Sequence, residues 1–453
     1  MHTYRQLFIA PEFTALFLMS AAQVAAQTLS GLALGTLVHA STGSPLLSAL
    51  AMFGPCLAQV VGAATLLSAA DRLPPRATLT GLALLFGLGT AAQAVPGLPV
   101  AAVFAVLAGL GTAAALGGGV RYGLLNEILP AEGRLLGRAA LNVSAGVVQV
   151  AGFALGGILV SALSARGALL TGAGLYLAAA ATARCGLSRR PPRATGRPSP
   201  AETWRTNARL WASRPRRHVY LALWVPNGLI AGCESLYVSY APRYAGLLFA
   251  CGALGMLAGD TAVGRFVPAR WRHRLVVPLC LLLAVPYLLF GLHPALPLAA
   301  AAVSLATVGY GAGLLLQERL LALTPPEASG HALGLHTSGM LTWQGVGAAL
   351  AGAVAERTSA ATGMAATAAA SIAVTLALAP GLRPGPPQPR THPATARAPR
   401  RHTGSASSRE KRLGLGSGVT DRRAKPAPPS RRAKSSRVRS RPPTLTSMFR
   451  SLI

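Results

Sequence analysis

Twelve apolar stretches of about twenty residues constrain the fold of this chain more than any other feature. The hydrocarbon core of a bilayer is about 30 Å thick, and an α-helix needs about 20 apolar residues to cross it. The stretches lie at about 13–37, 45–68, 77–95, 99–122, 140–163, 167–187, 218–240, 244–263, 274–293, 296–317, 331–355 and 359–380. Turn-forming residues such as Pro74-Pro75 and Pro325-Pro326 separate them. We therefore predict an all-α integral membrane protein with twelve transmembrane helices in the lipid bilayer.

The charge content excludes most other classes of protein. Only 12% of the 453 residues are charged and 52% are hydrophobic, whereas a soluble domain carries about 25% charged residues. The chain contains no Walker motif, and its glycine run Gly117-Gly118-Gly119 lies inside a predicted span rather than after a strand. The five cysteines form no CxxC motif. We expect no enzyme activity, no cofactor and no metal site.

The arginines predict the orientation, because positively charged loops stay on the cytoplasmic side. With twelve spans, both termini fall on one side, and that side receives all but three of the arginines that precede residue 382. The three exceptions are Arg166, Arg243 and Arg357. The asymmetry predicts a multi-pass protein of the cytoplasmic (plasma) membrane with both termini inside the cell.

An internal repeat divides the chain into two halves. At an offset of about 195 residues, Pro130 matches Pro325, Gln149 matches Gln344, and Gly152 matches Gly347. Paired six-helix halves are a common plan of transporters, with the substrate path between the halves. We predict two pseudo-symmetric halves at 1–187 and 218–381, a basic cytoplasmic linker at 188–217, and a tail at 382–453.

The tail differs in composition from the rest of the chain. It is rich in Pro, Arg, Ser and Thr, and it holds all three lysines, Lys411, Lys425 and Lys434. Such a segment cannot bury a core, so we predict that it is disordered. Attraction to anionic lipids and translation of a displaced reading frame are both open explanations. No nucleic-acid binding is expected, because only a single aromatic residue, Phe449, is interleaved with the basic ones.

Several loops resemble those of the major facilitator superfamily, and in particular its exporter branch of siderophore exporters and macrolide efflux proteins. The run from Leu124 to Glu132, continuing through Arg138 to Asn142, is similar to that branch's loop between helices four and five. The resemblance covers about residues 4–381. It implies a twelve-helix carrier that works by alternating access, and we expect a monomer.

The resemblance also implies a cytoplasmic gate. The loop between helices two and three keeps Asp71, Arg72 and Arg76 of the family pattern but has Leu67 in place of its first glycine. Asp260 and Arg265 occupy the equivalent loop of the second half. Charge-assisted hydrogen bonds between such groups would hold the inner side closed. Ordinary positive-inside anchoring is the alternative explanation.

Two departures from the drug/proton antiporters of the family weaken a standard proton relay. The arginine that they carry early in helix four is replaced by Ala105, and the fifth-helix pattern keeps Gly152, Gly156 and Gly157 but lacks its proline. Small residues at this spacing let two helices approach closely. We therefore assign the three glycines to helix packing.

Glu234 is the leading candidate for a coupling residue. It lies about fifteen residues into the seventh span, roughly 22 Å along the helix. An ionisable side chain at membrane depth is costly and marks a functional hypothesis. Glu234 is a candidate proton carrier or a partner for a cationic substrate. Pairing with Arg243, or exposure beyond a shorter helix, is the structural alternative.

Uncharged polar side chains complete the set of substrate or coupling candidates: Gln23, Gln27, Asn227, Trp343 and Gln344. Gln23 and Gln27 lie four residues apart and so share one helix face. In related exporters an acid often stands at the position of Gln27. Hydrogen bonding between helices is the alternative role of these residues.

We expect a secondary transporter that moves a small organic molecule outward, with coupling to protons as a hypothesis. Uptake by uniport or symport remains open, as does a non-transporting scaffold or sensor that kept the fold.

Overall fold

The computed structural model describes residues 4–66, 73–192, 200–325 and 328–382. Within these ranges every regular element is a helix. Asp71 and Arg72 of the predicted gate lie outside the described residues, as does the predicted tail from residue 383 onward.

The first half is built from long helices joined by short turns. Its elements are α1 (Tyr4–Phe8), α2 (Pro11–Thr42), α3 (Pro45–Leu66), α4 (Pro75–Gln93), α5 (Val100–Ile128) and α6 (Ala131–Gly186). α6 is interrupted at Ser164, whose φ of 72° is non-helical. The chain reverses its direction there, so α6 supplies both the fifth and the sixth crossing.

The second half contains more interruptions. Its elements are α7 (Pro200–Ala212), α8 (Arg214–Ser235), α9 (Tyr237–Tyr240), α10 (Ala245–Phe266), α11 (Ala269–Ala284), η2 (Val285–Leu292), α12 (Leu296–Val308), η3 (Gly309–Gly311), α13 (Ala312–Ala322), α14 (Ser329–Arg357), α15 (Ala360–Leu378) and η5 (Ala379–Leu382). The 3₁₀ segment η2 continues α11, and η3 joins α12 to α13. Each composite therefore forms one crossing.

These helices confirm the predicted fold class. In the described part of the chain, nine segments are long and apolar enough to span a bilayer, and one of them, Leu136–Gly186, contains the reversal at Ser164. α4 and α14 are less apolar, but they pack against the others as full-length crossings. Together these segments provide the twelve crossings predicted from the sequence.

Several helices extend beyond the apolar stretches that predicted them. α5 continues to Ile128 and α6 begins at Ala131, whereas the predicted spans end near 122 and begin near 140. Arg121 and Asn142, which are near the limits of the predicted spans, therefore lie well inside regular helices. The length of an apolar stretch does not reveal the polar helical turns at its ends, because these turns are held by backbone hydrogen bonds and not by hydrophobicity.

Proline and glycine set the turns between helices. Pro11, Pro45 and Pro75 begin helices, where their missing N–H costs nothing. Gly43 follows α2 with a φ of 67° and donates its N–H to the carbonyl of His39. Glycine adopts this left-handed conformation without strain, so the turn into α3 is tight.

Polar contacts define the two ends of the bundle. At one end, Arg190 binds Glu12 and Glu127, and Arg272 binds Glu318. We call this the arginine-rich end. At the other, Ser44 donates to Glu356 at 2.7 Å, and Tyr240 donates to the carbonyl of Pro294 at 3.2 Å. We call this the opposite end.

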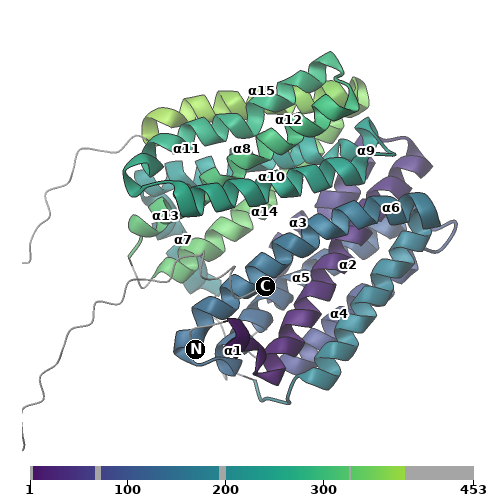
Figure 1. The fold of residues 1–453 in the computed structure, drawn as a ribbon, viewed down its shortest axis with the longest axis vertical. Coiled ribbons are helices and arrows are strands. Elements are labelled where there is room, and N and C mark those ends of the chain that lie inside the picture. Colours follow the sequence, from purple (N-terminus) through teal and green to yellow (C-terminus); the bar gives the residue numbers. More distant parts are fainter. Residues whose placement is uncertain (1–3, 67–72, 193–199, 326–327, 383–453) are drawn as a thin grey trace, which may run out of the picture. The chain divides into compact units, whose positions relative to one another are not determined.

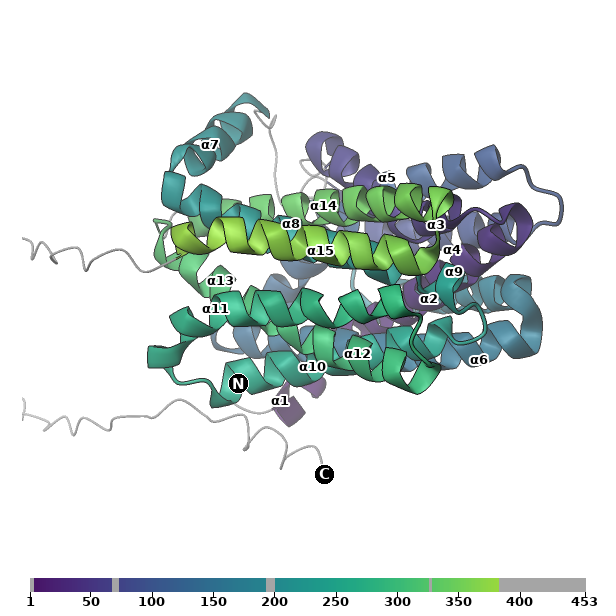
Figure 2. The same ribbon diagram turned by 90° about the horizontal axis from the view of Figure 1, so that it is seen from above.

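Helices α2–α6 form one group and α8–α15 form the other (Figure 1). The main contacts between the groups are those of α3 with α14 and of α6 with α10, and the neighbouring positions of α3 and α14 can be followed in Figures 1 and 2. Each half buries its own apolar clusters, centred on side chains such as Leu124 and Leu125 in the first half and Tyr237 and Tyr287 in the second. The cluster around Tyr237 also includes Leu32 of α2 and packs against Met52 and Phe153, so the core of the second half extends into the interface between the halves.

Candidate functional site

Glu234 lies in the last turn of α8, directly before the helix breaks at Leu236. Its side chain is half-buried, and its Oε1 accepts a hydrogen bond of 2.9 Å from the hydroxyl of Tyr310. Among the described residues no cation pairs with it. Arg243, the partner considered from the sequence, is exposed and makes no such contact. Glu234 is therefore a carboxyl group held by a neutral donor.

Tyr310 reaches Glu234 because its helix is interrupted. It is the middle residue of η3, between Gly309 and Gly311. A methyl group added at Gly309 would lie 2.5 Å from the backbone of α11, so only glycine permits this close approach. A 3₁₀ segment within a long helix often marks a hinge at a functional site. From the sequence, Tyr310 was only a secondary candidate for which a structural role was favoured, and the Gly-Tyr-Gly pattern was the available signal for more.

A second polar pair lies on the same face of α8. Asn227 precedes Glu234 by seven residues, about two turns. The Oδ1 of Asn227 accepts a hydrogen bond of 3.2 Å from Nε2 of Gln344 on α14. Asn227 and Tyr310 both line a small cavity of about 30 Å³. The structure thus brings Asn227, Gln344, Tyr310 and Glu234 together, although they come from three helical segments.

Trp343 lies at the close contact of α8 with α14. A methyl group added at Gly228 would lie 2.3 Å from the Trp343 carbonyl, and Gly228 also faces Gly347. Small residues let these two helix backbones approach closely. Trp343 is half-buried there, next to Gln344.

The glutamines of α2 remain apart from this cluster. Gln23 is half-buried, Gln27 is exposed, and neither forms a hydrogen bond with a described residue. Because no helix partner binds them, their amides are available for other ligands. Ser20, three residues before Gln23, continues the same face toward the arginine-rich end.

The described gate residues lie in different surroundings. Arg76 donates from its Nη2 to the carbonyl of Arg184, which ties the start of α4 to the end of α6. Asp260 is half-buried in α10 and makes no hydrogen bond or ion pair within the described ranges. Arg265 is exposed, with its guanidinium 5.7 Å from the ring of Phe266. Asp260 and Arg265 are therefore not joined in this structure.

The three glycines of α6 lie at close helix contacts. A methyl group added at Gly152 would lie 3.2 Å from Thr28 of α2. One added at Gly156 would lie 3.4 Å from both Leu29 and Leu32 of α2. Gly157 faces the other half: a methyl group there would lie 3.1 Å from Gly246 of α10. Beside this contact, Phe153 stacks on Phe249 with ring centroids 4.6 Å apart.

A polar contact joins the halves at the opposite end. Glu356 lies at the end of α14. Its Oε2 accepts a hydrogen bond of 2.7 Å from Ser44 Oγ and one of 3.2 Å from the Leu46 backbone N–H. Ser44 Oγ also accepts from the Leu47 N–H at 3.1 Å, so Ser44 caps α3 while donating to Glu356. A carboxylate at a helix N-terminus is favourable. Glu356 was not among the candidates predicted from the sequence, because its partner Ser44 lies 312 positions away.

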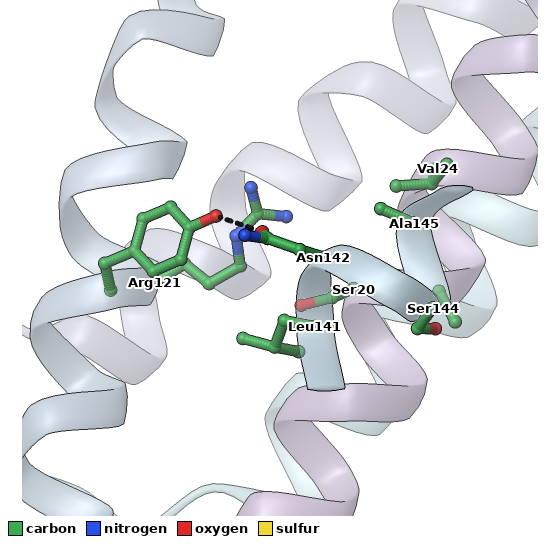
Figure 3. Close-up of a pocket in the computed structure, with 9 residues that line it drawn as sticks. Ser20, Val24, Arg121, Leu141, Asn142, Ser144 and Ala145 are labelled. Carbon is green, nitrogen blue, oxygen red and sulfur yellow. Dashed lines mark hydrogen bonds between the residues drawn. The ribbon is translucent and has the colours of Figure 1, made fainter. Parts of the chain in front are cut away.

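A cavity in the first half was also not predicted. Figure 3 shows Ser20 of α2, Arg121 of α5 and Asn142 of α6 around it. In the sequence, Arg121 contributes only a charge that orients the chain. It lies at the predicted end of the fourth span, near residue 122, and the continuation of α5 to Ile128 places it inside the helix.

Comparisons with known proteins agree with this architecture. A family model described as Major Facilitator Superfamily matches residues 16–245. No curated protein sequence matches the chain.

Several solved transporters share the fold. A bacterial homolog of the human lysosomal transporter Spinster, in an inward-facing and unoccupied conformation, has a TM-score of 0.63 at 13% identity, covering 82% of this chain and 95% of that one. The nucleoside transporter NupG has a TM-score of 0.66 at 14% identity, covering 83% and 100%. A POT family transporter in complex with a thioalcohol-conjugated peptide has a TM-score of 0.62 at 10% identity, covering 82% and 96%.

Identities this low establish the fold and not the substrate. The family match extends over more than half of the chain, and the proteins that share its fold are transporters rather than enzymes. The chain belongs to the Major Facilitator Superfamily of multi-pass membrane transporters.

Proposed function

We propose that the protein is a proton-coupled carrier that exports a small organic molecule across the cytoplasmic membrane. The arginine-rich end then faces the cytoplasm, as the positive-inside rule requires, and the opposite end faces outward. The outward direction is supported by the resemblance of the loop between helices four and five to the exporter branch.

The Glu234–Tyr310 hydrogen bond carries this proposal. A carboxyl group at this depth, without a cation beside it, can alternate between a protonated and an ionised form as water reaches it. Tyr310 can donate to the ionised form and accept from the protonated one. Because Tyr310 lies on the interrupted helix, a movement of η3 would change the surroundings of Glu234.

The contacts between the halves support alternating access. Ser44 with Glu356, Gly157 with Gly246, and Leu46 with Gly352 all lie toward the opposite end. Under the proposed orientation these contacts close the outer side. The transport cycle requires them to open, and a hydrogen-bonded contact to the exposed residue Glu356 suits repeated breakage.

The direction is tested by comparing small molecules in cells and medium, with and without the gene, in the native host. An exported compound accumulates inside the deletion strain and falls in its medium. A compound left unused in the medium would instead indicate uptake. No reproducible difference across several media would favour a non-transporting protein and contradict the proposal.

The coupling is tested with that compound in proteoliposomes. We expect Glu234→Gln to abolish flux driven by a pH gradient while exchange of labelled for unlabelled compound continues, because exchange needs no net proton movement. Glu318→Gln is the matched control, since Glu318 is an exposed carboxylate paired with Arg272. Full gradient-driven flux in Glu234→Gln would end the coupling hypothesis.

A further inference from the structure

The Arg121 cavity has the size of one chemical group. It lies between α2, α5 and α6 toward the arginine-rich end, and its volume is about 50 Å³. Sites for whole drug-sized ligands span about 300–1,000 Å³. The polar residues that line it are Ser20, Arg121, Tyr122, Asn142 and Ser144 (Figure 3). The cavity therefore suits a few waters or one small polar group of a larger molecule.

Its lining presents donors that lack acceptors. Ser20 is only 6% exposed, and its Oγ has no hydrogen-bond partner among the described residues. The buried Nε of Arg121 likewise has none there. Oδ1 of Asn142 accepts a hydrogen bond of 3.2 Å from the Tyr122 hydroxyl. The amide NH₂ of Asn142 therefore remains able to donate. Buried polar groups are normally paired, so the Ser20 hydroxyl and the Arg121 Nε indicate a missing acceptor, and the exposed Asn142 amide lies beside them.

The charge around the cavity is positive. The guanidinium carbons of Arg121 and Arg138 lie 5.5 and 5.9 Å from the centre of the Tyr122 ring. Arg138 donates to Asn126 at 3.3 Å, and Arg190 engages the acids Glu12 and Glu127. Within the described ranges, neither Arg121 nor Arg138 has a carboxylate partner. Guanidinium groups match carboxylate and phosphate oxygens well.

We infer that this cavity binds the carboxylate or phosphate group of the transported molecule. The inference rests on the proposed transport function and adds a substrate class, an organic anion. Ser20, Gln23 and Gln27 share one face of α2. The rest of the molecule extends along this face, where the two glutamine amides are unpartnered.

Binding is tested on the purified full-length protein in detergent, by its melting temperature in acetate or inorganic phosphate against chloride at equal ionic strength. We expect saturable stabilisation by acetate, phosphate or both. Arg121→Gln should weaken it about tenfold or more, and Ser20→Ala, which keeps the charge, by a few-fold. Arg134→Gln is the matched control, because Arg134 lies at the same end but outside the cavity and donates to the Leu129 carbonyl. Equal stabilisation of the wild type, Arg121→Gln and Arg134→Gln would overturn the inference.

A lipid headgroup is the other source of the same chemistry. Melting is therefore compared in phosphatidylcholine vesicles with and without phosphatidylglycerol. Stabilisation that needs phosphatidylglycerol and Arg121, without any effect of acetate or phosphate, would assign the cavity to lipid and overturn the inference.

Flux separates this inference from the proposed function. A compound identified by the gene-deletion comparison should bear a carboxylate or phosphate, and its flux should fall in Arg121→Gln but not in Arg134→Gln. Normal flux in Arg121→Gln would overturn the anion site while leaving transport intact. Absence of any flux in the wild type, with Arg121-dependent anion binding preserved, would overturn the transport function and the substrate assignment but not the anion site.

Discussion

Replacing Glu356 by glutamine should shift the balance between the closed and open states of the opposite end. Oε2 of Glu356 accepts two hydrogen bonds from the start of α3, from Ser44 Oγ at 2.7 Å and from the Leu46 N–H at 3.2 Å. Glutamine keeps the shape of the side chain and removes its charge. It therefore tests the charge of this contact between the halves rather than the packing of α14.

The magnitude follows from the two bonds and their exposure. Hydrogen bonds to charged groups contribute about 1.5–3 kcal/mol each where they are buried, and the charge at the helix N-terminus adds about 0.3–1 kcal/mol. Glu356 is exposed, and exposed ionic contacts contribute only about 0.2–1 kcal/mol. We therefore expect a total loss of about 1–2 kcal/mol. This corresponds to a factor of about 5–30 in the ratio of closed to open states.

The assay is the distance between two spin labels at the opposite end, one in each half. Val95 and Leu292 are suitable sites, because they are 53% and 79% exposed, and the native cysteines are first replaced. Wild type should show mainly the short distance, and Glu356→Gln should gain a second, longer population. Arg357→Gln, a change of charge at the neighbouring exposed residue, should leave the distribution unchanged. An identical distribution in Glu356→Gln and wild type would refute the reasoning.

Two further predictions concern stability. Gly246→Ala should lower the melting temperature, because the added methyl would lie 2.6 Å from Gly157 and overpacking costs about 1–3 kcal/mol. The control Gly174→Ala, with open space around it, should be neutral or slightly stabilising. Equal melting temperatures of the two variants would contradict this prediction. Arg190→Gln removes the contacts with Glu12 at 2.8 Å and with Glu127 at 3.4 Å. Thermal melting should show that the protein is destabilised by about 1 kcal/mol at low salt and by less at 1 M salt. A loss of stability that does not depend on salt would argue against an electrostatic contribution.

Part of the candidate site was predictable from the sequence. Glu234 stands out because a carboxylate within an apolar stretch is costly unless it has a use, and the structure gives it Tyr310 as a partner. Asn227 and Gln344 were also candidates, but their hydrogen bond joins helices that are 117 positions apart. Neither local periodicity nor composition contains information on such a pairing.

The rest of the site depended on helix extent and on tertiary contacts. Arg121 was interpreted as a charge at a helix end, because the apolar stretch ends near 122. The continuation of α5 to Ile128 and the start of α6 at Ala131 instead place Arg121 and Asn142 around one cavity. A polar segment is helical wherever its backbone hydrogen bonds form within the helix, and hydropathy does not reveal how far such a helix extends.

The sequence alone determined the class of this protein, because bilayer thickness fixes the length of an apolar helix. It also determined the twelve crossings, since a turn at Ser164 and interruptions at η2 and η3 do not alter the apolar length between polar loops. Only the tertiary structure decided which polar groups meet: Glu356 with Ser44, Tyr310 with Glu234, and the donors around Arg121. These contacts depend on side-chain positions across helices distant in the chain, and the hydrophobic effect that builds the bundle is non-directional and does not specify them.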